Sequence, residues 1–289
     1  MIRATENKTT AVLYESIFDF SKTDDIKNTS NKALFDSIVE PSLENYGQND
    51  SLNNWLGAPT LKEFNNRLEK GWTEGVEKIQ KIATKEINPK SLRRRKIKAD
   101  QGNELDIHAV YRGDLSRAWT KTKKQAKAGT SRSISLICNL SCSHSVTSDK
   151  LFWRGASVLK LADVLTQAGY NVSIYGATGT DVHGKKELFQ FIEIKAEDQP
   201  LDISNLASLV AMPGFKRTKF HSGNVYEADR LGDVCPSGLG VPLNRFDKAI
   251  AMLPISQNYF TQGDINDKSS AETWIDSVMA KIESQEVLA

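Results

Sequence analysis

The stretch Ile134-Ser135-Leu136-Ile137-Cys138-Asn139-Leu140-Ser141-Cys142-Ser143 decides the fold class. Its first half is an apolar run typical of a buried strand, and its second half is a serine-rich loop. A helical pattern from Leu151 to Ala168, then Gly169 and a second apolar segment from Asn171 to Ala177, follow directly. Strand, loop, helix and strand in this order form a βαβ unit, whose ligands bind where loops leave the carboxyl ends of strands. We therefore predict an α/β protein with a doubly wound, mostly parallel sheet flanked by helices, and an α-helical N-terminal extension.

The composition narrows the class of protein. The chain has 289 residues, a formal net charge of +2 and three cysteines. So few cysteines argue against a disulfide-stapled secreted protein. The N-terminus lacks the apolar core of a signal peptide, and no apolar run approaches the ~20 residues that span a bilayer. We expect a cytoplasmic protein without membrane contact, in the host cytoplasm if the chain is viral.

Two regions are predicted: a helical N-terminal region with a basic connector over residues 1–125, and the α/β domain over residues 126–289. Between Thr60 and Ile87, apolar side chains recur at spacings of three and four, which indicates an amphipathic helix. Thr60 and Glu63 form a capping box, and Gly71 and Gly75 indicate a break into two helices. The segment 100–127 is predicted to be helical again.

In the second region, strands and helices alternate. We expect Asn171–Ala177 to pair with Leu188–Ile194 as a hairpin, and Asp202 to cap a helix over 202–212. The apolar run Ala249–Leu253 is interpreted as a buried strand, and Ala271–Ile282 as the closing helix.

Several motifs, in their order along the chain, resemble the von Willebrand factor A (VWA) family. Asn139-Leu140-Ser141-Cys142-Ser143 resembles its Asp-x-Ser-x-Ser metal loop, with Asn139 in place of the aspartate. Gly102–Ala109 is similar to a stretch that precedes the VWA domain in the MoxR-associated group. Gly238–Leu243 resembles the turn that carries the metal-binding threonine, with Val241 in its place, and Leu253–Ser256 resembles the Thr-Asp-Gly strand end.

The resemblance implies a function without catalysis. It implies an adaptor that docks a protein partner, such as a MoxR-type AAA+ ATPase, through a loop face formed by Asn139, Ser141, Ser143, Val241 and Ser256. Trp55-Leu56-Gly57 and Gly71–Gly75 look similar to uncharacterised phage-encoded proteins, which implies a phage origin.

The metal loop is expected to be degenerate. Magnesium is normally held by at least one carboxylate, because neutral oxygens alone do not repay its dehydration. Asn139, Ser141 and Ser143 are weak candidate ligands, so we expect no metal and no cofactor. The favoured interpretation is that the serines hydrogen-bond to the loop backbone.

Other motifs give no enzyme class. Gly179–Lys186 matches a P-loop, but a strand follows where the phosphate-binding helix should begin. Cys142 and His144 lack an orienting acid, so a cysteine nucleophile is disfavoured. His221 has no evident partner, and Cys138 and Cys235 suit a zinc site poorly.

The alternative function is a nucleic-acid-associated accessory protein. Two basic clusters, within residues 93–98 and 121–127, could converge on one surface and bind phosphate without base specificity. The phosphate-binding candidates are Arg93, Arg94, Arg95, Lys96, Lys98, Lys121, Lys123 and Lys124. Of the two functions, we favour the adaptor.

Overall fold

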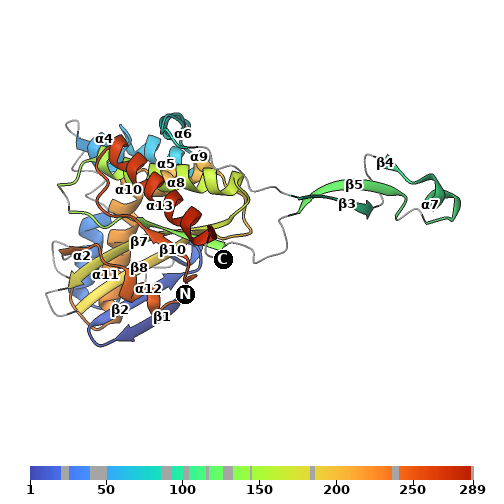
Figure 1. Ribbon diagram of the computed structural model, residues 1–289. Coiled ribbons are helices and arrows are strands. Elements are labelled where there is room, and N and C mark those ends of the chain that lie inside the picture. Colours follow the sequence, from blue (N-terminus) through green and yellow to red (C-terminus); the bar gives the residue numbers. More distant parts are fainter. Residues whose placement is uncertain are drawn as a thin grey trace.

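The structure is a computed structural model of the whole chain (Figure 1). Several residues named above lie outside its described part, namely 86–87, 100–103, 126–127, 144, 183–185 and 238–240. The described residues are 1–20, 26–39, 51–85, 93–99, 104–114, 117–125, 133–143, 145–182, 186–235 and 241–287.

A seven-stranded mixed sheet forms the centre of the main part of the molecule, which we call the body. Its strands run in the order β1-β2-β8-β7-β6-β10, and β9 pairs with the carboxyl end of β7. The pairs β2–β8, β6–β7 and β6–β10 are parallel, whereas β1–β2, β7–β8 and β7–β9 are antiparallel. The strands are β1 (Ile2–Glu6), β2 (Thr9–Tyr14), β6 (Ser133–Asn139), β7 (Asn171–Val182), β8 (Lys186–Lys195), β9 (Val241–Leu243) and β10 (Tyr259–Thr261). The predicted α/β class is confirmed, but the sheet is mixed and not mostly parallel.

The predicted hairpin accounts for part of this mixed character. β7 and β8 pair antiparallel with Ala177 opposite Phe191, so the P-loop-like stretch enters a strand and not a helix. β2 and β6 are almost entirely buried, because helices or further strands cover both of their faces.

Helices cover the two faces of the sheet unequally. Alternate strand residues, such as Leu136 and Ile137, belong to different apolar clusters on opposite faces. The larger cluster lies under α5 (Leu61–Lys70), α6 (Thr73–Gln80), α8 (Ser148–Gln167), α9 (Ile203–Val210) and α13 (Lys268–Val287), which form one layer in Figure 1. The smaller cluster is covered by α12 (Asp247–Ala251).

Shorter elements complete the body. A continuous helical segment joins α10 (Pro213–Phe215), a π-helix (Lys216–Phe220) and α11 (His221–Arg230). The remaining helices are α1 (Ile17–Phe20), α2 (Thr29–Val39) and α4 (Ser51–Leu56). No helix in the described part of the chain is long and apolar enough to cross a membrane.

The strand predicted at Ala249–Leu253 is wrong, since this segment contains α12. Burial of Phe246, Ala249, Ile250 and Leu253 follows a helical spacing of three and four. The sheet instead takes its strand from β10, which pairs in parallel with β6.

The N-terminal region is not simply helical. β1 and β2 form one edge of the main sheet, where β2 pairs with β8, so the sheet draws strands from both sides of residue 125. Tertiary pairing with a distant strand buries all six residues of Thr9–Tyr14, although their surroundings in the sequence are polar.

The cap and break predictions hold in part. The Thr60 hydroxyl accepts a hydrogen bond from the Glu63 amide at 3.1 Å, and α5 ends at Gly71, whose φ is 85°. The predicted break into two helices lies at Gly71, between α5 and α6, and Gly75 lies inside α6. Asp202 caps α9 as predicted, and α8 and α13 occupy their predicted positions.

A second, three-stranded sheet lies apart from the body in Figure 1. It consists of β3 (Arg93–Ala99), β5 (Trp119–Gln125) and β4 (Glu104–Leu105), with α7 (Ile107–Tyr111) at its far end. We call this unit the arm. The helix predicted over 100–127 is found only at α7, whereas Glu104–Leu105 and Trp119–Gln125 are strands.

Candidate functional site

The predicted loop face is largely buried at its centre. The side chain of Asn139 is fully buried, and its Oδ1 accepts a hydrogen bond from the Ser141 amide at 2.9 Å. The Ser141 hydroxyl accepts one from the Gly179 amide at 2.8 Å, and the Ser143 hydroxyl contacts the Ser145 hydroxyl at 3.1 Å. These side chains therefore hold the loop against β7 and against itself.

The five predicted face residues do not meet on one rim. β9 continues the sheet beyond the end of β6, which places exposed Val241 opposite Asp181 of β7. Ser256 lies just before β10, and the neighbouring Asn258 side chain donates to the carbonyl of Ser133 at 3.0 Å. Ser133 begins β6 and Asn139 ends it. Ser256 therefore lies near the amino end of β6, whereas the loop lies at its carboxyl end.

A cluster of buried cations surrounds the same loop. Arg154 of α8 donates from Nη1 to the Ser141 carbonyl at 2.7 Å, and its Nη2 lies 3.5 Å from the exposed carboxylate of Asp264. Arg217 of the π-helix donates to the carbonyls of Asn54 and Val146. The guanidinium groups of these two arginines fix both ends of the loop that follows β6.

Lys216 takes a different role from the two arginines. It is 7 % exposed, and its Nζ lies 2.8 Å from Nε2 of His221. Burial lowers the pKa of Lys216, and the positive charge of Arg217 adds to this effect. The pKa of His221 lies well below its ordinary value because the ring is buried, with Lys216 and Arg217 adding positive charge beside it. A neutral imidazole therefore accompanies a buried amine.

The π-helix explains why Lys216 and His221 meet. Residues five apart lie on different faces of an α-helix, but the wider π turn brings positions i and i+5 together. Sequence reasoning assigned His221 no partner, because it ended the preceding helix at residue 212 and predicted no helix around His221. No residue pattern in the segment 213–222 signals the wider turn.

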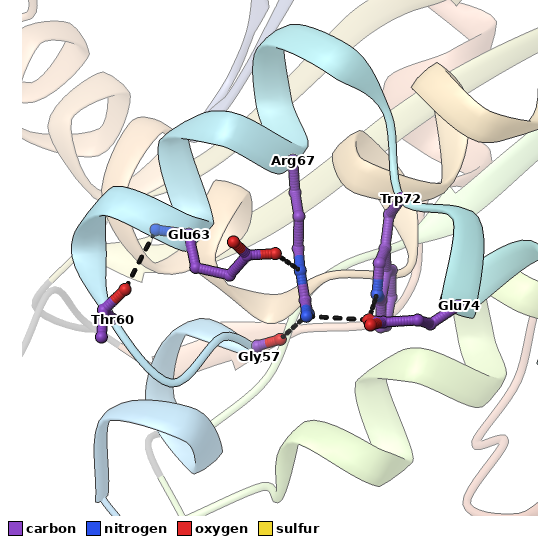
Figure 2. Close-up of polar contacts among 6 residues, drawn as sticks. All are labelled: Gly57, Thr60, Glu63, Arg67, Trp72 and Glu74. Atoms are coloured by element: carbon purple, nitrogen blue, oxygen red, sulfur yellow. Dashed lines mark hydrogen bonds and ion pairs between the residues drawn. The ribbon is translucent and has the colours of Figure 1, made fainter.

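A separate cavity of about 320 Å³ lies beside the start of α8. Its walls include Gly57, Arg67, Trp72, Lys78, Asp149 and Phe152. Figure 2 shows Arg67 between Glu63, Glu74 and the carbonyl of Gly57, to which it donates at 2.9, 2.8 and 3.0 Å. Because the guanidinium already has these acceptors, the network serves to hold α4, α5 and α6 together.

The arm brings the two predicted basic clusters together. β3 and β5 pair antiparallel over their whole lengths, with Arg94 opposite Lys124 and Arg95 opposite Lys123. β3 supplies five cations and β5 three, and neither strand contains an acid. Lys98 is paired with Asp106 at 2.6 Å, and the pKa of that carboxyl is lowered mainly by the hydrogen bond from Lys98. We call the β3–β5 pair the basic ribbon.

The described residues give no evidence of a metal centre. Within the ranges given above, no three His, Cys, Asp or Glu side chains come together in a way that could hold a metal ion. Asn139, Ser141 and Ser143 hydrogen-bond to protein atoms, as described above.

These features define an α/β protein with a mixed sheet, a loop held by buried cations and an appended basic ribbon. The chain belongs to the family described as "Domain of unknown function (DUF7192)", whose model matches residues 3–286. One family model thus spans both the body and the arm. Comparisons with curated proteins and with solved structures gave no match.

Proposed function

We propose that this protein is a nucleic-acid-associated accessory protein that binds phosphate backbones through the basic ribbon. The supporting observation is the strand register, which pairs a cluster within residues 93–98 with one within residues 121–125. Two runs that are separate in the sequence thereby become neighbouring strands of one hydrogen-bonded pair.

The energetics of the ribbon favour an anionic ligand. Like charges at directly opposite positions, as at Arg94 and Lys124, destabilise a strand pair by a few tenths of a kcal/mol to about 1 kcal/mol. A polyanion removes this repulsion and releases its own condensed counterions on binding. A two-stranded ribbon also fits the major groove of duplex DNA.

The end of the arm adds an aromatic side chain. Tyr111 of α7 is 86 % exposed, and tyrosine rings stack on unpaired bases without regard to sequence. Binding that combines phosphate contacts with such stacking is strongly dependent on salt and weakly dependent on sequence.

The test compares two quadruple variants by fluorescence anisotropy with single- and double-stranded oligonucleotides. One variant replaces Arg93, Arg94, Arg95 and Lys96 with alanine. The matched control replaces four exposed lysines of the body with alanine, Lys62, Lys81, Lys150 and Lys281.

At low salt, we expect the wild type and the control to bind and the ribbon variant to lose binding. If all four side chains contact phosphates of a duplex, the slope of log K against log salt becomes shallower by about 3.6, at about 0.9 per contact. Absence of binding by the wild type, or equal losses in both variants, would refute the proposal.

A second candidate is the protein-interaction adaptor that the VWA resemblance implies. The observation that favours it is the concentration of exposed apolar side chains at the end of the arm, Leu105, Ile107, Val110 and Tyr111. Such patches commonly mark protein contacts. If Ile107→Asp abolishes co-purification with a MoxR-type AAA+ ATPase and leaves oligonucleotide binding intact, the adaptor role is supported; if the wild type does not bind such an ATPase, it is rejected.

A further inference from the structure

The cavity beside the start of α8 is formed by three segments that lie far apart in the sequence. They are the region from α4 to α6, the first turn of α8 and the turn between α9 and α10. Its volume of about 320 Å³ lies at the lower end of the range for ligand pockets. At about 30 Å³ per water molecule it holds about ten waters, which suits a ligand of about ten to fifteen non-hydrogen atoms.

Rigid apolar groups form much of the cavity wall. The rings of Trp72 and Phe152, both almost fully buried, meet edge to face with their centroids 5.7 Å apart. The Trp72 indole donates a hydrogen bond to Glu74 at 3.2 Å, which fixes its orientation (Figure 2). Further apolar surface comes from Pro59, Ala211 and Pro213. The wall is therefore preorganised to bury an apolar group.

Four charged side chains also line the cavity, and only two of them neutralise each other. Arg67 and Glu74 form an ion pair at 2.8 Å. Lys78 and Asp149 have no ion-pair partner within the described part of the chain, and they do not pair with each other. One positive and one negative group are thus free to bind a ligand at the same cavity.

The two unpaired charges lie around the same aromatic ring. The Lys78 ammonium nitrogen lies 5.6 Å from the centroid of the Phe152 ring. Oδ2 of Asp149 accepts a hydrogen bond from the Trp153 indole at 3.1 Å, and the centroid of that indole lies 5.0 Å from the centroid of Phe152. A ligand beside the Phe152 ring that carries both an anionic and a cationic group would satisfy both side chains and leave no excess charge.

We propose that this cavity binds a free α-amino acid with a large apolar side chain. The ligand carboxylate pairs with Lys78, its ammonium group pairs with Asp149, and its side chain packs against Trp72 and Phe152. The two charge-assisted contacts orient the ligand, and burial of its side chain supplies hydrophobic stabilisation. The cavity belongs to the body, so this proposal is independent of nucleic-acid binding by the basic ribbon.

The test measures binding by isothermal titration calorimetry with four probes. They are L-phenylalanine, N-acetyl-L-phenylalanine, which lacks the ammonium group, L-phenylalaninamide, which lacks the carboxylate, and glycine, which lacks the apolar side chain. The variants are Lys78→Gln and Asp149→Asn. Their matched controls are Glu77→Gln and Lys150→Gln, at exposed neighbouring positions that do not belong to the cavity wall formed by the described residues. All four positions are exposed, so the fold should be preserved.

We expect the wild type to bind phenylalanine with a Kd below about 1 mM, and each of the other probes at least about tenfold more weakly. Lys78→Gln should weaken the binding of phenylalanine and N-acetylphenylalanine but not of phenylalaninamide. Asp149→Asn should weaken the binding of phenylalanine and phenylalaninamide but not of N-acetylphenylalanine. The two controls should bind as the wild type does.

Absence of phenylalanine binding up to about 10 mM would overturn the proposal, and so would equal losses in the cavity variants and their controls. If N-acetylphenylalanine binds as tightly as phenylalanine, the site recognises only a carboxylate, such as that of a peptide C-terminus, and the free amino acid is rejected. Equal binding of phenylalaninamide or of glycine would reject it in the same way. Oligonucleotide binding is measured separately, so the two proposals can fail independently.

Discussion

The Tyr14 hydroxyl donates a hydrogen bond to the Glu227 carboxylate at 2.5 Å, and both side chains are almost completely buried. Arg3 pairs with the same carboxylate. One buried acid of α11 therefore ties down the two N-terminal strands, β1 through Arg3 and β2 through Tyr14. Burial, together with the negative charge of Glu227, raises the pKa of Tyr14, so the phenol keeps its proton and remains a donor.

Tyr14→Phe should lower the free energy of unfolding by about 1–3 kcal/mol, because it leaves a buried carboxylate oxygen without its donor. Tyr111→Phe is the matched control, since the Tyr111 ring is exposed, and it should change stability by less than about 0.5 kcal/mol. Urea denaturation of both variants checks the prediction. Equal effects at the two positions would show that the Glu227 contact contributes nothing.

In the Arg67 network of Figure 2, we expect Arg67 to contribute to the stability of the fold and Glu74 to contribute little. Arg67 is mostly buried, bonds the Gly57 carbonyl and lies 5.3 Å from the Trp72 ring, so Arg67→Met should cost about 1–3 kcal/mol. Glu74 is 70 % exposed, and Glu74→Gln should have little effect because water screens the pair. Thermal unfolding of the two variants distinguishes these roles, and a larger loss in Glu74→Gln would contradict this division.

Gly155→Ala should destabilise the protein although alanine favours helices. A Cβ at this position of α8 would overlap the carbonyl oxygen of Val210, where α9 crosses closely. Overpacking of this kind costs about 1–3 kcal/mol. Gly263→Ala is the control, because apart from its chain neighbours no heavy atom in the described part of the chain lies within 4 Å of its added Cβ. Denaturant midpoints should fall for the first variant only.

Stability should decrease as the pH falls below about 6.5, partly because of His221. The unfolded ring binds a proton near that pH, whereas the folded ring, whose pKa is lowered by burial and by Lys216 and Arg217, does not. The stabilisation is therefore complete above about pH 6.5 and is lost as the pH falls towards the folded pKa. His221→Gln should flatten the stability profile between about pH 5 and pH 6.5, which urea denaturation at several pH values checks.

Local patterns in the sequence predicted the local elements of the fold. The apolar run at Ile134–Cys138, the α8 pattern and the β7–β8 hairpin are confirmed, because short-range periodicity and neighbouring strands determine them. β2 was missed because its burial depends on pairing with β8, far away in the sequence. α12 was mistaken for a strand because a short apolar run fits either structure.

The candidate sites were predictable to different degrees. The sequence indicated that the two basic clusters could converge, and the register of β3 and β5 places them on paired strands. The loop after β6 was also identified, but its buried cations were not. Lys216 and His221 meet through a π turn, and Arg154 reaches the loop from within a helix whose pattern indicated only packing. Ser256 was placed with the loop because the strand beside it was assigned ten residues too early, at 249 instead of 259.

The parallel pairing of β2 with β8 has a consequence during synthesis. Thr9 and Glu187, whose side chains hydrogen-bond, are separated by 178 positions, so the first strands leave the ribosome long before their partner exists. Until translation has passed residue 195, the end of β8, the β1–β2 hairpin has an apolar edge with nothing to pair with. Nascent chains halted before that point should therefore be bound by chaperones, and chains released beyond it should not.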